Sequence, residues 1–94
     1  MKVFHIDAQL RTKGDIDFTL SYFVFVKREK IEDRYVYTMR DSQEQLVKNI
    51  LARDPFSVAL ESDNWMDAVS AHFDENVRSL NDRVDNVIIT EIVI

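Results

Sequence analysis

The sequence has no cysteine, one glycine and one proline among its 94 residues. Without cysteine the chain can form neither a disulfide framework nor a thiolate zinc site, and it has no thiol nucleophile. The absence fits a reducing compartment, so we expect a cytoplasmic protein. Because phosphate-cradling loops need several glycines, Gly14 alone argues against a nucleotide-binding fold, and we expect no cofactor.

Long hydrophobic runs are also missing from the chain. The longest, 22–26 and 87–89, are far too short to span a membrane. Asp7 stands where the apolar part of a secretory signal would lie, so we expect neither a signal peptide nor a membrane association. Hydrophobic residues make up 46% of the chain, which is enough for a folded core. The length predicts one compact domain, residues 1–94.

The first 40 residues alternate between apolar and polar side chains, which is typical of β-strands with one buried face. Residues 2–10 predict the first strand, and a turn that uses the conformational freedom of Gly14 follows it. Residues 16–27 predict a second strand, whose later half is apolar on both sides and therefore central in a sheet. The charged stretch 27–34 predicts a solvated connection, and residues 34–40 a third strand.

The hydrophobic period then changes to that of helices. Asp41 and Ser42 are good N-cap residues with Glu44 and Gln45 three positions on, so we expect a helix over about 42–53. The segment 55–61 fits either a short strand or the start of a second helix. After the cap residues 62–64 comes the strongest pattern in the chain, an apolar helical stripe. The stripe consists of Trp65, Ala68, Val69, His72, Phe73, Asn76, Val77 and Leu80.

The last segment, residues 86–94, is rich in β-branched side chains on both faces and predicts a second buried strand. The order of elements is then β-β-β-α-α-β. It predicts an α+β fold in which one mainly antiparallel sheet is packed by two helices.

Few residues suggest catalysis. His5 and Asp7, two apart on a strand, could provide two metal ligands or a base with its orienting carboxylate, so a small metal-dependent hydrolase is the most remote alternative. A metal site needs further ligands, and we expect the other histidine, His72, to lie at the edge of the core. No serine has the glycine-flanked surroundings of a strained nucleophile turn. We therefore expect a non-enzymatic protein without catalytic or metal-binding residues.

Charge is distributed unevenly, with a net charge of +2 over residues 1–40 and −7 over residues 41–94. Asp63, Asp67 and Asp74 lie on the side of the predicted long helix that faces away from its apolar stripe. Such acidic faces often serve solubility, but they also dock on basic partners. Our first hypothesis is a small binding or regulatory module that acts on a protein with a basic surface through these three residues. For such a short, acidic, cysteine-free chain we expect an accessory or inhibitor protein of a phage or mobile element.

The segment 22–28 suggests an alternative function. Phe23 and Phe25 share a strand face with Lys27, and Arg28 follows. Aromatic rings beside cations can stack unpaired bases, so these four residues would form a single-stranded nucleic-acid site. A net charge of −5 opposes the binding of a polyanion, which makes a protein the preferred partner and nucleic acid the second choice.

The doubly apolar strands also bear on self-association. The two helices could cover opposite faces of the sheet. If both cover one face instead, Phe23, Phe25, Val36 and part of the segment 87–94 are left on the other face. An exposed apolar surface of that size favours contact between copies, and a two-fold contact is the commonest way to bury it. We therefore expect a homodimer.

Overall fold

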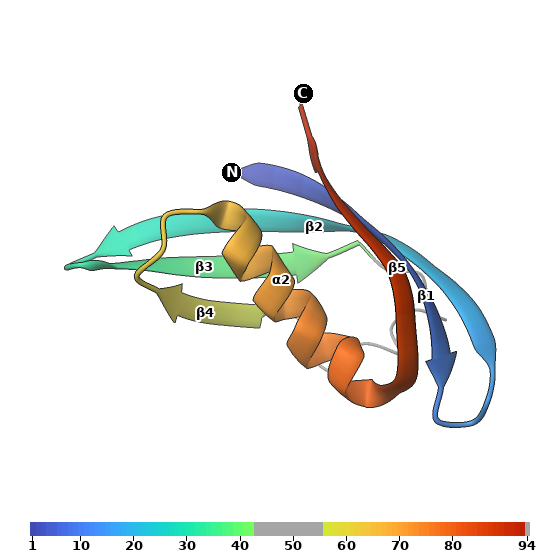
Figure 1. Ribbon diagram of the computed structural model, residues 1–94. Helices are drawn as coiled ribbons and strands as arrows, with labels where there is room; N and C mark the ends of the chain where they lie inside the picture. Colours follow the sequence, from blue (N-terminus) through green and yellow to red (C-terminus); the bar gives the residue numbers. More distant parts are fainter. Residues whose placement is uncertain (43–55, 94) are drawn as a thin grey trace.

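The computed structural model describes residues 1–42 and 56–93 as a five-stranded sheet with one α-helix packed on it (Figure 1). The strands are β1 (Lys2–Thr12), β2 (Asp17–Ile31), β3 (Arg34–Asp41), β4 (Phe56–Leu60) and β5 (Asn81–Ile92). The helix α2 (Trp65–Asn76) is followed by one 3-10 turn, η1 (Arg78–Leu80). The strand order is β4-β3-β2-β1-β5, and every neighbouring pair is antiparallel. The predicted α+β fold with one mainly antiparallel sheet is confirmed.

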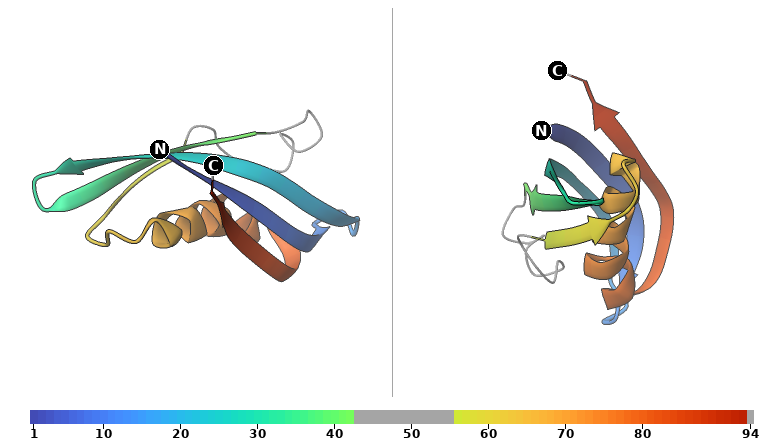
Figure 2. Two further views of the ribbon diagram at one scale, coloured as in Figure 1. Left: turned by 90° about the horizontal axis from the view of Figure 1, so that it is seen from above. Right: turned by 90° about the vertical axis from the view of Figure 1, so that its left-hand side faces the viewer.

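Alternate residues of the central strands form the core. They face α2, which lies along one side of the sheet, called here the inner face (Figure 2, left view). The alternation predicted for the first strand is confirmed, and β2 is the middle strand as its apolar half indicated. The buried inner-face residues of β1, β2 and β3 are Phe4, Ile6, Ala8, Leu10, Leu20, Tyr22, Val24, Val26, Tyr37 and Met39.

The two turns of the β1–β2–β3 meander differ from the sequence expectation. Gly14 does not use its conformational freedom; Asp15 takes the left-handed conformation instead, with φ of 60°. An aspartate tolerates this region better than most residues do. The stretch 27–34 is not a solvated connection, because β2 continues to Ile31 and the turn is formed by only two residues, with Glu32 at φ 58°. Charged side chains fit in this part of β2 because it is exposed on both faces.

The apolar stripe of α2 packs on the inner face. The helix begins after Asn64, whose side-chain Oδ1 accepts a hydrogen bond from the backbone N–H of Met66 at 3.0 Å. It ends at Asn76, earlier than the stripe predicted, and Leu80 in η1 is 38% exposed. Trp65, which opens the stripe, is only partly buried. The buried helix residues are Ala68, Val69, His72, Phe73 and Asn76.

The predicted packing of the sheet by two helices is confirmed only in part, since the described residues contain one α-helix. The helix expected over about 42–53 lies, apart from Ser42, outside the described residues. Within 1–42 and 56–93 the helical elements are α2 and η1 rather than two long helices. The segment 55–61, which the sequence left open, contains the strand β4. Its Phe56 is 2% exposed on the inner face and pairs with Met39 of β3.

The last strand is not the buried strand that its composition predicted. β5 lies at the edge of the sheet and pairs with β1, and its Ile88 and Ile92 are 60% and 36% exposed. The register of the β1–β5 pair shifts at a bulge between Asp7 and Gln9 of β1. Opposite this bulge, Asn86 of β5 has a left-handed backbone with φ of 53°. Such a bulge reverses which side chains face the core. A β-branched composition indicates that a segment forms a strand, but not how many neighbours it has.

Phe73 provides a test of this packing. Its ring is 1% exposed on the core side of α2, so Phe73→Ala should lower the free energy of unfolding by about 3–5 kcal/mol. Leu80→Ala is the matched control, since Leu80 is 38% exposed, and it should cost about 1 kcal/mol or less. Urea denaturation followed by Trp65 fluorescence measures both. Equal losses in the two variants would contradict the placement of the stripe.

Candidate functional site

Among the described residues, a group of exposed apolar side chains lies on the face of the sheet opposite α2, called here the outer face. Phe23 and Phe25 lie on it and are 41% and 39% exposed, as the alternation of β2 predicted. The strand register places Val3 between Phe25 and Ile92, and Arg40 on the other side of Phe25. One row across four strands therefore contains Arg40, Phe25, Val3 and Ile92.

The next rows add polar groups to this face. The ring of His5 lies against that of Phe23, with 4.9 Å between the centroids, and Thr90 is the β5 neighbour of His5. The Nε2 of His5 is 2.8 Å from the hydroxyl of Ser21. Asp7, two residues on, lies between Ser21 and Ile88. The apolar centre is thus bounded by polar side chains on this side.

Lys27 and Arg40 flank the apolar centre on the side away from His5. A hollow of about 280 Å³ is lined by Met1, Phe25, Lys27, Thr38 and Arg40. These lining residues include two positive charges and no acid. We call Val3, Phe23, Phe25, Lys27, Arg40 and Ile92 together the outer-face patch. Its apolar centre and charged rim are the general composition of a protein interface.

Arg28 is not part of this patch, although the sequence grouped it with Phe23, Phe25 and Lys27. Successive residues of a strand point to opposite faces, so Arg28 lies on the inner side of β2. Its guanidinium donates a hydrogen bond to the backbone carbonyl of Asp63 at 2.7 Å. Three of the four residues predicted for a nucleic-acid site are therefore brought together and the fourth is not.

Arg28 belongs instead to a cluster of cations and rings at the start of α2. The guanidinium is 4.5 Å from the ring centroid of Trp65 and 4.9 Å from that of Tyr35. Lys2 lies over the same Trp65 ring at 5.1 Å, and Lys30 over Tyr35 at 5.6 Å. Such contacts stabilise partly exposed rings. The cluster fastens the segment before α2 to the β2–β3 hairpin, which explains why Trp65 is only partly buried.

The three aspartates predicted as a partner-binding face are all exposed. Asp67 and Asp74 lie on the side of α2 opposite its buried residues, and Asp63 precedes the helix. Asp67 accepts a hydrogen bond from the hydroxyl of Ser62 at 2.6 Å, in the first turn where a negative charge favours the helix. Asp74 forms an ion pair with Arg78 at 3.1 Å. Two of these three carboxylates therefore have local structural partners.

His72 is fully buried rather than at the core edge, and its polar neighbour is a carboxylate. Its Nε2 lies 2.7 Å from Oδ1 of Asp41, and the two side chains are 1% and 0% exposed. The hydroxyl of Tyr22 is 3.4 Å from Nδ1 of the same ring. Asn76, one turn along α2, is also 0% exposed, and its side-chain atoms have no hydrogen-bond partner among the described residues. Because the group is sealed from solvent, a substrate has no access to it.

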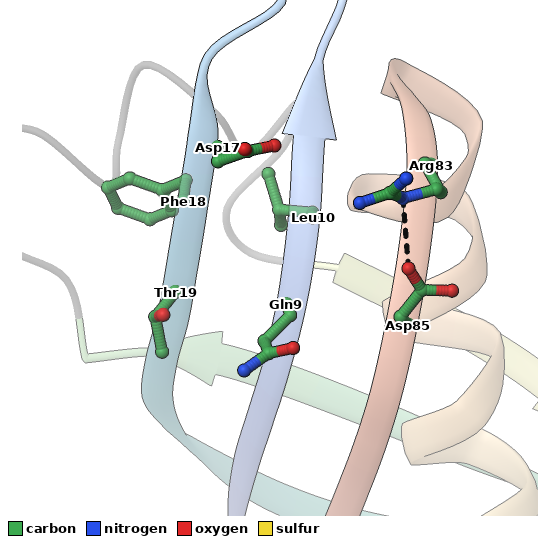
Figure 3. A pocket seen from close by; sticks show the side chains of 7 residues that line it. All are labelled: Gln9, Leu10, Asp17, Phe18, Thr19, Arg83 and Asp85. Carbon is green, nitrogen blue, oxygen red and sulfur yellow. Dashed lines mark ion pairs between the residues drawn. The ribbon is translucent and has the colours of Figure 1, made fainter.

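A second hollow lies at the other end of the outer face (Figure 3) and has a volume of about 300 Å³. Its charges are already paired. Arg83 contacts Asp85 at 2.9 Å, and Asp17 accepts a hydrogen bond from Arg11 at 3.0 Å, which lowers the pKa of Asp17. The hollow therefore offers little unused polarity to a ligand. It is lined by Gln9, Leu10, Asp17, Phe18, Thr19, Arg83 and Asp85.

The pair His5 and Asp7 gains no further ligands. Within the part of the chain that the structure describes, no three histidine or acidic side chains gather closely enough to hold a metal ion. Among the same residues, no helix is long and apolar enough to cross a bilayer. Neither a scan of protein-family models nor searches of curated proteins and of solved structures finds a match to this chain. Function must therefore be argued from the geometry.

Several important neighbours were missed by reasoning from the sequence. Arg40 and Val3 belong to the outer-face patch because of the register of β1, β2 and β3, which the alternation of one strand does not reveal. The contact of the Asp41 side chain with His72 was not predicted either, and the helix that Asp41 was expected to cap lies outside the described residues. The buried position of His72 within the apolar stripe was the signal that it needed a polar partner.

Tyr22 generates a prediction for alkaline pH. Burial, and then the carboxylate of Asp41, raise the pKa of the Tyr22 hydroxyl above its ordinary value in the folded state. The unfolded chain releases this proton near pH ~10, whereas the folded chain retains it. The contribution to stability is therefore fully present below pH ~10 and is lost as the pH rises further.

Tyr22→Phe should accordingly flatten the decline of the unfolding free energy above pH ~10. Urea denaturation of the two proteins at a series of alkaline pH values measures this slope. The same slope in both would contradict the assignment to Tyr22.

Proposed function

We propose that this protein is a non-enzymatic binding module that contacts another protein through the outer-face patch. The observation that carries the proposal is the row Phe25, Val3 and Ile92, which continues across three strands beside the exposed ring of Phe23. A contiguous apolar surface with a polar rim is typical of docking sites. Aromatic residues at the centre of such a surface often supply most of the binding energy.

The rim suggests the chemistry of the partner. Lys27 and Arg40 stand beside Phe25, so the matching surface carries apolar side chains flanked by acidic ones. The acidic helix face formed by Asp63, Asp67 and Asp74 would select the opposite partner, one with a basic surface. It is the second candidate surface for the same function, and the local partners of Asp67 and Asp74 weaken its case.

Single-stranded nucleic acid is the alternative ligand, and one observation favours it. Phe23 and Phe25 lie two residues apart on one exposed face, about 7 Å from each other, with Lys27 and Arg40 beside them. Bases can stack on such a pair of rings. The overall charge of −5 and the separation of Arg28 from the patch oppose this alternative.

Two finer expectations rest on the sequence. We place the protein in the cytoplasm, as an accessory or inhibitor protein of a phage or mobile element. An inhibitor acts by covering the surface of its target, and a single continuous patch on a chain of 11.1 kDa suits that role.

The proposal is tested by comparing three forms of the protein as baits. Phe23→Ala with Phe25→Ala removes the centre of the patch, and both residues are exposed enough for the fold to persist. The matched control reverses Asp63, Asp67 and Asp74 to Lys. A host protein captured by the wild type and identified by mass spectrometry should bind the lysine variant and not the alanine variant. With the purified partner, the alanine variant should lose ~2 kcal/mol or more, roughly 30-fold in Kd.

The opposite pattern, with binding lost only in the lysine variant, would assign the partner to the acidic helix face. For the nucleic-acid alternative, the anisotropy of labelled single-stranded DNA and RNA is followed at physiological salt. We expect no saturable binding by the wild type. Tight binding that the lysine variant strengthens, and that the alanine variant weakens by about 1–3 kcal/mol per lost stack, would overturn the protein assignment.

A further inference from the structure

Among the described strands, none pairs with the outer side of the second half of β5, residues 87–92. β5 is the last strand in the order, with β1 as its neighbour (Figure 1). The backbone N–H and C=O groups along its outer side are therefore open to another strand. The only charged side chain in this segment is Glu91, and the segment contains neither glycine nor proline.

The first half of β5 is protected in the ways that edge strands usually are. It carries Asp82, Arg83 and Asp85, and it ends in the bulge at the left-handed Asn86. Charges and bulges both discourage the addition of a further strand. The opposite edge, β4, is only five residues long. The capacity for edge pairing is thus concentrated in residues 87–92.

This segment is also incompletely covered on both of its faces. Ile88 and Ile92 point to the outer face and are 60% and 36% exposed. Val87 and Ile89 pack against the core but are only partly buried. The reason is the position of α2, which contacts β3 and β4, whereas β5 meets η1 (Figure 1). A neighbouring strand would cover apolar side chains on both faces at once.

We propose that two copies of the chain pair their β5 strands antiparallel along residues 87–92 and join two sheets into one of ten strands. An antiparallel pair has two-fold symmetry, so the same segment can occupy both sides of the contact. A two-fold axis at Thr90 places Ile88 opposite Ile92 of the partner subunit on the outer face, and it places Val87 opposite the partner's Val93, one residue beyond β5. The same register places Glu91 opposite Ile89 of the partner subunit and keeps the two glutamates from facing each other, which would be unfavourable.

The proposed contact is short, so the dimer is weak. Six residues of strand extend about 20 Å, and a stable interface usually buries about 800 Å² on each partner. We therefore expect a reversible equilibrium that a single charge can shift. The contact uses the free edge of β5 and shares only Ile92 with the outer-face patch, so Phe25 can be changed without touching the pairing segment.

Sedimentation equilibrium of the full chain tests the proposal between roughly 5 μM and 500 μM, the range in which weak dimers form. The wild-type mass should rise from 11.1 kDa toward twice that value. Ile88→Lys places a charge on the pairing segment and should weaken association at least tenfold, since lysine protects natural edges. Ile16→Lys is the matched control, because Ile16 is 62% exposed and lies outside β5. It should behave as the wild type does.

Hydrogen exchange of the wild type separates edge pairing from a face-to-face contact and needs no variant. Edge pairing should slow exchange at alternate amides within 87–92 as the concentration rises. Phe25→Lys, on the outer face, should leave the dimer intact. A mass of 11.1 kDa at every concentration would overturn the proposal, and so would a dimer that Phe25→Lys abolishes without protection in β5.

Discussion

The packing of α2 on one face of the sheet is the interaction on which the other features of this molecule depend. The helix brings Val69 and Phe73 against the inner-face residues of β1, β2 and β3, and each fully buried side chain of this size contributes about 1.5–3 kcal/mol. Since the strands alternate, every inward residue that α2 buries has an outward neighbour. The same periodicity that encloses Tyr22 and Val24 therefore exposes Phe23 and Phe25, so the core and the candidate site are two consequences of one arrangement.

The position of α2 along the sheet is set by a polar contact within this apolar layer. His72 faces Asp41, and a buried ionisable group that loses its partner costs about 3–5 kcal/mol. A shift of α2 by one turn would move His72 about 5.4 Å along the helix axis and separate the two groups. Apolar burial is tolerant of such a shift, whereas this contact is not. The pair thus selects one packing arrangement among several that bury similar areas.

Local periodicity explains what the sequence could predict. The alternation of residues 2–10 and the helical spacing of Val69 and Phe73 were sufficient for the core, because each pattern reports how one element meets one surface. Which residues lie side by side on adjacent strands depends on strand order and register, and the periodicity of a single strand does not reveal either. Arg40 joins the patch through the β2–β3 pairing, and the β-branched residues after Asn86 gave no indication that β5 is an edge strand. Arg28 was misplaced because it was grouped with Phe23, Phe25 and Lys27, although it directly follows Lys27 and therefore points to the opposite face.

The spatial separation of charge bears on what the outer face can bind. Asp67 and Asp74 project from α2 away from the sheet, whereas Lys27 and Arg40 lie on the opposite side of it. Packed layers are about 10 Å apart, and the Debye length at physiological salt is about 8 Å. The helix carboxylates are therefore largely screened at the patch, and among the described residues Lys27 and Arg40 are the charges that line its hollow. The net charge of −5 determines which partners the whole molecule attracts or repels at long range. Selectivity at the patch itself depends on Lys27, Arg40 and the rings beside them.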